Sequence, residues 1–358
     1  MASTTIIHEE ESILKHHCKR SNIDKLSSLL IGLFMWILMG FNSYNADYKA
    51  YEFLYNRICL YGINSDPGIE VGFKTLMYIF SFFSNNYQVF LCVTSFFCIL
   101  FLIVIVAKYT NHVAFTLILF FIFGFFSNAI QIRNFISMLF ILFAIRVFIN
   151  TMGKKSYIYY IILVVIASLF HITSLFYLVL VFIKLKKKYI NVLIITILLT
   201  LLFTGNNLQN YFLDTKFVTY LDGENTAGGL KNVLLLIYFA VNIVIIKKMV
   251  FKLTDYNKNS LFYYIYIINL LVSTSFLWVL INNNFIRLIR NIYLLNYVLY
   301  SHFFYKFYKK TKIKNYFLLI IYLFYIVFSA YFFTIKGSSI ETGFLALFKN
   351  NIIFNYLF

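Results

Sequence analysis

The chain has 358 residues, of which 61% are hydrophobic and only 12% are charged, and its mean hydropathy is +0.80. Soluble domains carry about a quarter charged residues, so an ordinary globular protein is excluded. Charge-free apolar runs of about 18 residues or more recur along the chain, and such runs predict membrane-spanning helices. Outer-membrane strands would instead alternate polar and apolar residues over about 10 positions. We therefore expect an all-α, polytopic integral membrane bundle.

The net charge of +18 would suit a nucleic-acid-binding protein, but its distribution indicates membrane topology instead. Lysines and arginines gather in short connectors between the apolar runs, and such connectors face the cytoplasm. This assignment places the N-terminus in the cytoplasm and leaves 44–69 and 205–230 outside. We expect no nucleic-acid partner. The four cysteines fit no metal-binding spacing and no nucleotide-binding glycine loop is present, so we expect no metal and no cofactor.

Hydropathy predicts about ten spans, and broken or re-entrant elements bring the bundle to about 10–12 membrane helices. In chain order the spans are 26–43, 87–107, 112–128, 131–150, 157–183, 189–204, 231–248, 261–281, 285–305 and 315–335. We treat 26–335 as a single transmembrane catalytic domain. A cytoplasmic segment, 1–25, precedes it, and an external interfacial tail, 336–358, follows it.

Two segments do not fit a simple crossing. The run 157–183 has about 27 apolar residues where one crossing needs about 20, and both flanking lysines, Lys155 and Lys184, belong to basic connectors. It must then form a hairpin of two short helices, with its apex near Ser168–Ser174 and His171 on the external side. The stretch Gly68–Ser84 is too short and too polar at its start to span, so we expect an external interfacial or re-entrant helix.

Polar groups beside external helix ends are functional candidates, because ionisable groups at membrane depth cost several kcal/mol. Asp47, Tyr48 and Tyr51 recur at three- and four-residue intervals, so a short helix would place them on one face. Aromatic rings beside a carboxylate suit sugar binding, and an interfacial aromatic belt is the alternative. Glu70 opens the external helix, whose dipole favours the ionised carboxylate.

Arginines mark the head of two later helices. Arg133 has no acidic neighbour in sequence, and Gln131 and Asn134 add hydrogen-bonding groups beside it. Arg287 and Arg290 are three residues apart and share a helix face. Guanidinium forks match phosphate oxygens bidentately, whereas snorkelling to lipid phosphates is the alternative. We expect the three arginines to converge in one external cavity.

Four patterns follow one another along the sequence. They are the Asp–aromatic cluster, the stretch EVGF from Glu70 to Phe73, Ile-Arg at the head of a span, and FHIT from Phe170 to Thr173. A late arginine-bearing helix follows them. Together they resemble the EpsG branch of the Wzy-type polysaccharide polymerases over about Phe41 to Tyr300. Many relatives carry an arginine shortly before the first Asp, where this chain has Asn42 and Tyr44.

The resemblance implies a multi-pass glycosyltransferase with its active site on the external side of the bacterial plasma membrane. Such enzymes transfer a growing glycan from undecaprenyl pyrophosphate to another lipid-linked repeat unit, and so build O-antigen, capsule or exopolysaccharide. Its implied partners are undecaprenyl-pyrophosphate-linked oligosaccharides and membrane lipid, with a chain-length regulator protein as a further candidate.

This chemistry distributes roles over the candidate residues. Arginines can stabilise the leaving pyrophosphate, and a histidine or carboxylate can deprotonate the acceptor hydroxyl. We expect His171 as base, with Glu70 and Asp47 orienting the acceptor sugar. The expected substrate-binding residues are Arg133, Arg287, Arg290, Asn134, Gln131, Tyr48 and Tyr51. A structural histidine is the alternative for His171.

Other function classes remain open at this point. A lipid-linked glycan ligase or a membrane acyltransferase would share an embedded site with arginine and histidine. A transporter or flippase of a polysaccharide precursor would be expected to carry charges through the membrane and paired proline or glycine breaks. Here the candidate charges gather at one face and Pro67 is the single proline.

Overall fold

The computed structural model describes residues 20–65, 68–151, 153–212, 229–254, 260–281, 283–308 and 343–357. Within these ranges the chain is helical, without strands beyond an isolated antiparallel bridge between Asn42 and Asn351. The expected all-α class is confirmed. The predicted span 315–335 and residues 213–228 of the predicted external loop lie outside the described residues.

Five helical stretches in the described part are long and apolar enough to cross a membrane, so the chain is a polytopic membrane protein. They are α2 (Asn22–Gly40), α5 (Tyr87–Tyr109), the composite of α6 (Val113–Phe120), η2 (Phe121–Phe125) and α7 (Phe126–Ile130), α8 (Ile132–Asn150), and Leu261–Val279, which combines α13 (Leu261–Val272), η4 (Ser273–Ser275) and most of α14 (Phe276–Ile281).

The remaining predicted spans take other forms. The run 157–183 is two shorter helices, α9 (Lys154–Ser168) and η3 (Ile172–Lys184). Two helices of 26 residues follow, α10 (Lys187–Phe212) and α12 (Gly229–Thr254). The predicted span 285–305 is not one helix, because η5 (Asn283–Phe285) and α15 (Ile286–Arg290) precede α16 (Tyr293–Tyr308).

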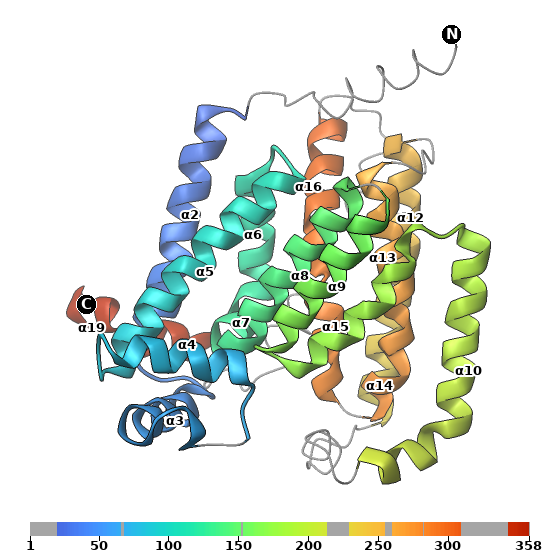
Figure 1. The fold of residues 1–358 in the computed structure, drawn as a ribbon. Coiled ribbons are helices and arrows are strands. Elements are labelled where there is room, and N and C mark those ends of the chain that lie inside the picture. Colours follow the sequence, from blue (N-terminus) through green and yellow to red (C-terminus); the bar gives the residue numbers. More distant parts are fainter. Residues whose placement is uncertain are drawn as a thin grey trace.

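The long helices run up and down in alternation, which gives the bundle two distinct ends (Figure 1). One end, called here the basic end, holds the connectors with Lys184, Lys188 and Lys306. The opposite end, called here the apex end, holds the turn between α9 and η3. Two helices that lie across this end, α3 (Tyr48–Tyr61) and α4 (Val71–Ser81), cover it beside α15 (Figure 1).

The predicted hairpin is confirmed. The chain leaves the α-helix at Ser168 and re-enters a helix at Ile172, so the apex is Leu169–His171. At the basic end, the Nζ of Lys184 donates to the carbonyl of Thr151 at 2.9 Å and to the Oγ of Ser156 at 3.1 Å. The end of η3 therefore lies beside the start of α9. The 15 residues of α9 rise about 22 Å and the 13 residues of η3, a 3₁₀ helix, about 26 Å. Both limbs are thus of similar length.

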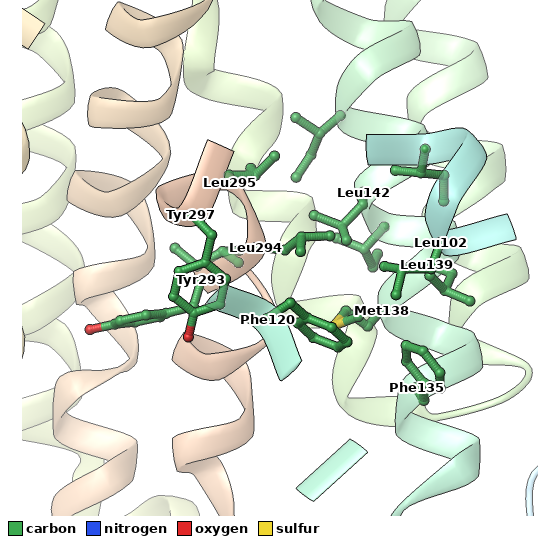
Figure 2. Close-up of a cluster of buried hydrophobic side chains, with 14 of the residues drawn as sticks. Leu102, Phe120, Phe135, Met138, Leu139, Leu142, Tyr293, Leu294, Leu295 and Tyr297 are labelled. Atoms are coloured by element: carbon green, nitrogen blue, oxygen red, sulfur yellow. The ribbon is translucent and has the colours of Figure 1, made fainter. Parts of the chain in front are cut away.

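The core of the bundle lies between α8 and α16. Buried leucines and aromatic rings from these two helices meet Leu102 of α5 and Phe120 of α6 (Figure 2). Phe135 is fully buried and its ring stacks at 6.1 Å from that of Phe120. In the membrane, where lipid tails are as apolar as these side chains, such packing stabilises the bundle mainly through van der Waals contact. This packing fixes the N-terminal ends of α8 and α16, which flank the apex.

The C-terminal segment returns to the apex end. It forms α18 (Phe344–Lys349) and α19 (Ile352–Leu357), which lie beside the end of α2 (Figure 1). The ring of Phe344 packs 4.5 Å from that of Phe126. The backbone of 41–43 pairs with 350–352 through the bridge between Asn42 and Asn351. The first span and the last described residues therefore meet.

Candidate functional site

The start of α4 docks on the hairpin apex. The backbone N–H of Gly72 donates to the carbonyl of Leu169 at 2.8 Å. A Cβ atom at position 72 would stand 2.7 Å from that same carbonyl oxygen, so only glycine permits this approach. The EVGF motif therefore contacts the residue immediately before the FHIT motif, almost 100 residues away in the sequence.

Glu70, the residue before α4, joins three elements. The side chain of Glu70 does not cap α4, although its place before the first turn of that helix would suit an acidic cap. Instead Oε1 accepts the backbone N–H of Ile172 at 3.2 Å, so Glu70 caps the N-terminus of η3. Its other oxygen, Oε2, accepts from Nη1 of Arg133 at 2.6 Å. Both oxygens of this carboxylate are therefore engaged within the protein.

Arg133, in the first turn of α8, has no acidic neighbour in the sequence, and the fold supplies an acidic partner from elsewhere in the chain. The partner is Glu70, 63 residues earlier in the chain, and the two side chains are 22% and 12% exposed. Its Nε also donates to the hydroxyl of Tyr51 at 3.1 Å, and its guanidinium lies over the Tyr51 ring at 5.5 Å. Arg133 thus ties α8 to both surface helices.

His171 is buried, with 2% of its surface exposed, at the tip of the hairpin. Its Nε2 lies 2.9 Å from Nη1 of Arg287, and its Nδ1 lies 2.9 Å from Oγ1 of Thr173. The Nε of Arg287 donates to the carbonyl of Asn284 at 2.7 Å. The histidine is thereby placed beside the arginines, as the hairpin prediction required.

Arg290 closes α15 and contacts the break between α7 and α8. Its Nη2 donates to Oε1 of Gln131 at 2.7 Å. Its Nε is buried and has no hydrogen-bond partner among the described residues. Arg287 and the hydroxyls of Tyr177 and Tyr297 lie within electrostatic range. A buried guanidinium N–H without a partner is costly, and an anion would satisfy it.

Asp47 is the residue before α3 and is half-buried. The described residues give its carboxylate no hydrogen bond and no ion pair, although Arg133 and Arg287 are both within electrostatic range. Burial raises the pKa of Asp47 above its ordinary value, and the two arginines partly oppose that rise. Of the three candidate bases, Asp47 therefore has the carboxylate that is free to act.

The other expected substrate contacts lie mainly inside the protein. Tyr48 is 7% exposed, and its hydroxyl donates to Oε1 of Gln88 at 3.0 Å. Tyr51 is about as buried, and its hydroxyl accepts the hydrogen bond from Arg133. The carboxamide of Asn134 forms a reciprocal pair with that of Asn291, at 3.0 and 2.9 Å. Their side chains hold helices together, and a sugar contact by any of them stays a prediction.

Asn42 precedes Asp47 in the loop after α2, and its environment is structural. It is fully buried; its Nδ2 donates to the carbonyl of Ala346 at 2.9 Å, and its Oδ1 accepts from Asn45. A longer charged side chain would not fit this arrangement unchanged.

Sequence reasoning missed several residues of the site. Thr173 and Asn284 contact the apex cluster, here defined as Asp47, Glu70, Arg133, His171, Arg287 and Arg290. Gly72 docks on Leu169 of the hairpin turn beside that cluster. Asn291, which follows α15 and links its end to α8, was also missed. The Gly in EVGF and the Thr in FHIT stand inside the quoted motifs, so a requirement for small size and for a hydroxyl could have been proposed there.

The apex cluster combines three guanidinium groups with two carboxylates and one imidazole. All three arginines lie within electrostatic range of His171. In the described part of the chain, no three histidine, cysteine or acidic side chains stand close enough to hold a metal ion. The arrangement can bind an anion through its excess positive charge and can accept a proton at a carboxylate.

Comparison with known proteins bears on this arrangement. The searches of curated proteins and of solved structures found no match. The model of one family, described as the EpsG family, matches residues 25–348, a range that holds every member of the apex cluster. Since this match extends over most of its length, the chain belongs to the EpsG family.

Proposed function

We propose that this protein is a membrane glycosyltransferase that joins lipid-pyrophosphate-linked oligosaccharide repeat units into a surface polysaccharide. Membership of the EpsG family supports a polysaccharide-polymerase-like role. The observation that carries the finer proposal is the apex cluster, in which cationic groups outnumber carboxylates at one end of a membrane bundle. Undecaprenyl pyrophosphate is the donor lipid that suits it, because its pyrophosphate is both the anion and the leaving group.

The anion would be held chiefly by Arg290 and Arg287. Arg290 supports this assignment most directly, because its buried Nε is unsatisfied and the acceptor that it has among the described residues, Gln131, is neutral. Arg133 already bonds to Glu70, so its first role is to fix α4 and the apex. A guanidinium aimed at developing charge stabilises the transition state more than the ground state.

The reaction is a substitution at the anomeric carbon of the donor glycan. The acceptor hydroxyl oxygen forms a bond to that carbon, and the bond from the carbon to the pyrophosphate oxygen breaks. The electron pair leaves with the pyrophosphate, which remains on undecaprenol, and the hydroxyl proton passes to a base on the protein. The products are a glycan longer by one repeat unit and undecaprenyl pyrophosphate.

Asp47 is the base that the geometry favours. Its carboxylate has no partner within the described residues, and its raised pKa makes it a stronger base than an exposed aspartate. Glu70 is engaged at both oxygens, and both ring nitrogens of His171 have partners. In this scheme His171 and Glu70 are positioning residues. A role for His171 as base is the competing outcome of the tests below.

The apex end would face the outside of the bacterial plasma membrane. Basic connectors face the cytoplasm in membrane proteins, and here they gather at the opposite end of the bundle. The N-terminus would then be cytoplasmic. Lipid-linked repeat units would approach from the outer leaflet, where the apex cluster lies near the ends of α8 and α15. A chain-length regulator is the protein partner that such a polymerase would use.

The test uses the full chain reconstituted in liposomes. Lipid-linked repeat units are extracted from cells that lack this protein and then added to the liposomes. We expect a ladder of products spaced by one repeat unit, together with released undecaprenyl pyrophosphate, both measured by mass spectrometry. Asp47→Asn should lower the elongation rate by about 10²–10⁴-fold, the usual contribution of a general base.

Other outcomes would overturn the proposal. Transfer onto an acceptor that carries no undecaprenyl pyrophosphate, without a ladder, would identify a ligase. Passage of the repeat unit across the bilayer without any bond formation would identify a transporter or flippase. Unchanged elongation in Asp47→Asn, with a normal ladder in the parent protein, would remove Asp47 as base and leave the polymerase function standing.

A further inference from the structure

The last described residues of the chain are built into the loop that carries Asp47. The backbone N–H of Ser43 donates to the carbonyl of Asn350 at 2.8 Å, and that of Ile352 donates to the carbonyl of Phe41 at 2.9 Å. The Nδ2 of Asn351 donates to the carbonyl of Ile37, at the end of α2, at 2.9 Å. These bonds hold the segment 343–357 against the loop 41–47 from two sides.

A chain of carboxamides continues from this contact to Asp47. The Nδ2 of Asn42 donates to the carbonyl of Ala346 at 2.9 Å, and its Oδ1 accepts from Nδ2 of Asn45 at 2.8 Å. The Oδ1 of Asn45 in turn accepts the backbone N–H of Asp47 at 3.0 Å. Asn42 and Asn45 are buried, so water does not compete strongly for these bonds.

We propose that the C-terminal segment 343–357 is a positioning element of the catalytic site and that it holds Asp47 through the amides of Asn42 and Asn45. The inference rests on the proposed function, because it assigns the segment to the placement of the base. Asp47 has no side-chain bond of its own within the described residues, so its position depends on its backbone. A base must come within about 3 Å of the proton that it removes, and loss of a single link in this series would spoil that distance.

The contact can be tested without any substrate. Residues 43 and 350 face each other next to the antiparallel bridge, where opposite Cα atoms stand about 4.5–5.5 Å apart, within the range of a disulfide. In a variant without native cysteines, we expect the pair Ser43→Cys and Asn350→Cys to form a disulfide in membranes on mild oxidation. The pair Ser43→Cys and Asn355→Cys serves as its control, because Asn355 is exposed on α19 and makes no side-chain contact with the loop.

The catalytic arm compares Asn42→Ala with Asn355→Ala, the same substitution at a position that does not touch the loop. Asn42→Ala should lower kcat about tenfold and leave KM for the lipid-linked repeat unit within about twofold, because the arginines that bind the anion are untouched. Asn355→Ala should behave as the parent protein. Closing a 43–350 disulfide in the Asn42→Ala protein should hold the segment 343–357 on the loop without restoring kcat, because the bond from Asn45 to Asn42 is still missing.

The outcomes separate the two proposals. No disulfide between 43 and 350, or normal kcat in Asn42→Ala while Asp47→Asn is inactive, would overturn the positioning role alone. Full activity of Asp47→Asn would overturn the assignment of the base, whatever the tail variants do. A rise in KM with unchanged kcat in Asn42→Ala would also contradict the inference, because it would place the tail in substrate binding. If Asn42→Ala is poorly folded, the disulfide-locked protein supplies the comparison.

Discussion

Nε2 of His171 lies 2.9 Å from Nη1 of Arg287, and this contact defines the state of the imidazole. A guanidinium can only donate, so Nε2 must accept and carries no proton. The hydrogen of the neutral ring is then on Nδ1, which donates to Oγ1 of Thr173 at 2.9 Å. The lone pair that a general base would use is already bound to Arg287. In this arrangement His171 orients an arginine.

Two substitutions at position 171 distinguish an orienting from a proton-accepting role. His171→Gln keeps an acceptor for Arg287 but cannot serve as a base at neutral pH, whereas His171→Ala removes both abilities. We expect His171→Gln to retain at least a tenth of the elongation rate and His171→Ala to lose most of it. Equal loss in both variants, with normal protein levels in the membrane, would favour His171 as the base.

The pH dependence of elongation should reflect Asp47. The carboxylate accepts a proton only while it is ionised, and burial raises its pKa above the ordinary value of about 3.9. Activity should therefore fall as the pH drops through this raised pKa. The acid limb of the kcat profile should lie at a higher pH than the ordinary pKa of an aspartate. Rates in liposomes between pH 4 and 8 measure it. If the residual activity of Asp47→Asn falls at the same acidic pH as the activity of the parent protein, the acid limb belongs to another group.

Arg290 should be sensitive to the shape of its side chain as well as to its charge. Lysine keeps the charge and loses the planar fork, so Arg290→Lys should raise KM for the lipid-linked repeat unit at least tenfold. Arg57→Lys, on α3, is the matched control, since Arg57 stands outside the apex cluster and packs over the ring of Phe53. Similar KM values for both variants would show that no bidentate contact is made at Arg290.

Gly72 should not accept even the smallest side chain. The Cβ atom of Gly72→Ala would stand 2.7 Å from the carbonyl oxygen of Leu169, so α4 would have to move away from the apex. We expect elongation to fall at least tenfold and the thermal midpoint of the purified protein to decrease. Thr75→Ala, on the same helix, removes only a local bond to the carbonyl of Val71 and should change neither quantity much. An unaffected Gly72→Ala protein would mean that the docking of α4 is dispensable.

The orientation of the bundle can be measured directly by cysteine labelling. In a variant without native cysteines, Tyr44→Cys at the apex end and Lys188→Cys at the basic end both place a thiol at an exposed position. An impermeant maleimide added to intact cells, with the outer envelope opened, should label position 44 and leave position 188 unmodified until the membrane is lysed. The reverse labelling pattern would show that the apex end faces the cytoplasm and would contradict the proposed orientation.

The hairpin shows how far sequence reasoning reaches. Lys155 and Lys184 both had to face the same side, so a run too long for one crossing had to turn back, and the apex fell where the structure has it. That inference needs only local composition and a membrane thickness. The same reasoning placed His171 at the turn of the hairpin, opposite the basic end, without any knowledge of its neighbours.

Partners far apart in the sequence were beyond such reasoning. Nothing near Arg133 indicates that Glu70 would pair with it, because the contact depends on how α4 lies across the apex. The tyrosines of α3 were placed correctly on one face, but periodicity does not say whether that face looks toward water or toward the core. Here it looks inward, because Tyr87 and Phe90 offer aromatic partners there.

The bond between Asn42 and the carbonyl of Ala346 joins residues 304 positions apart, and this has a consequence for biosynthesis. A ribosome adds about 5–20 residues per second, so roughly 15–60 s pass between the emergence of these two residues. During that interval the loop 41–47 has been made without the segment 343–357 that packs against it. On the proposal made above, a nascent chain that already contains all three arginines of the apex cluster still lacks the segment 343–357 that positions Asp47, so elongation should begin only once that segment has been made.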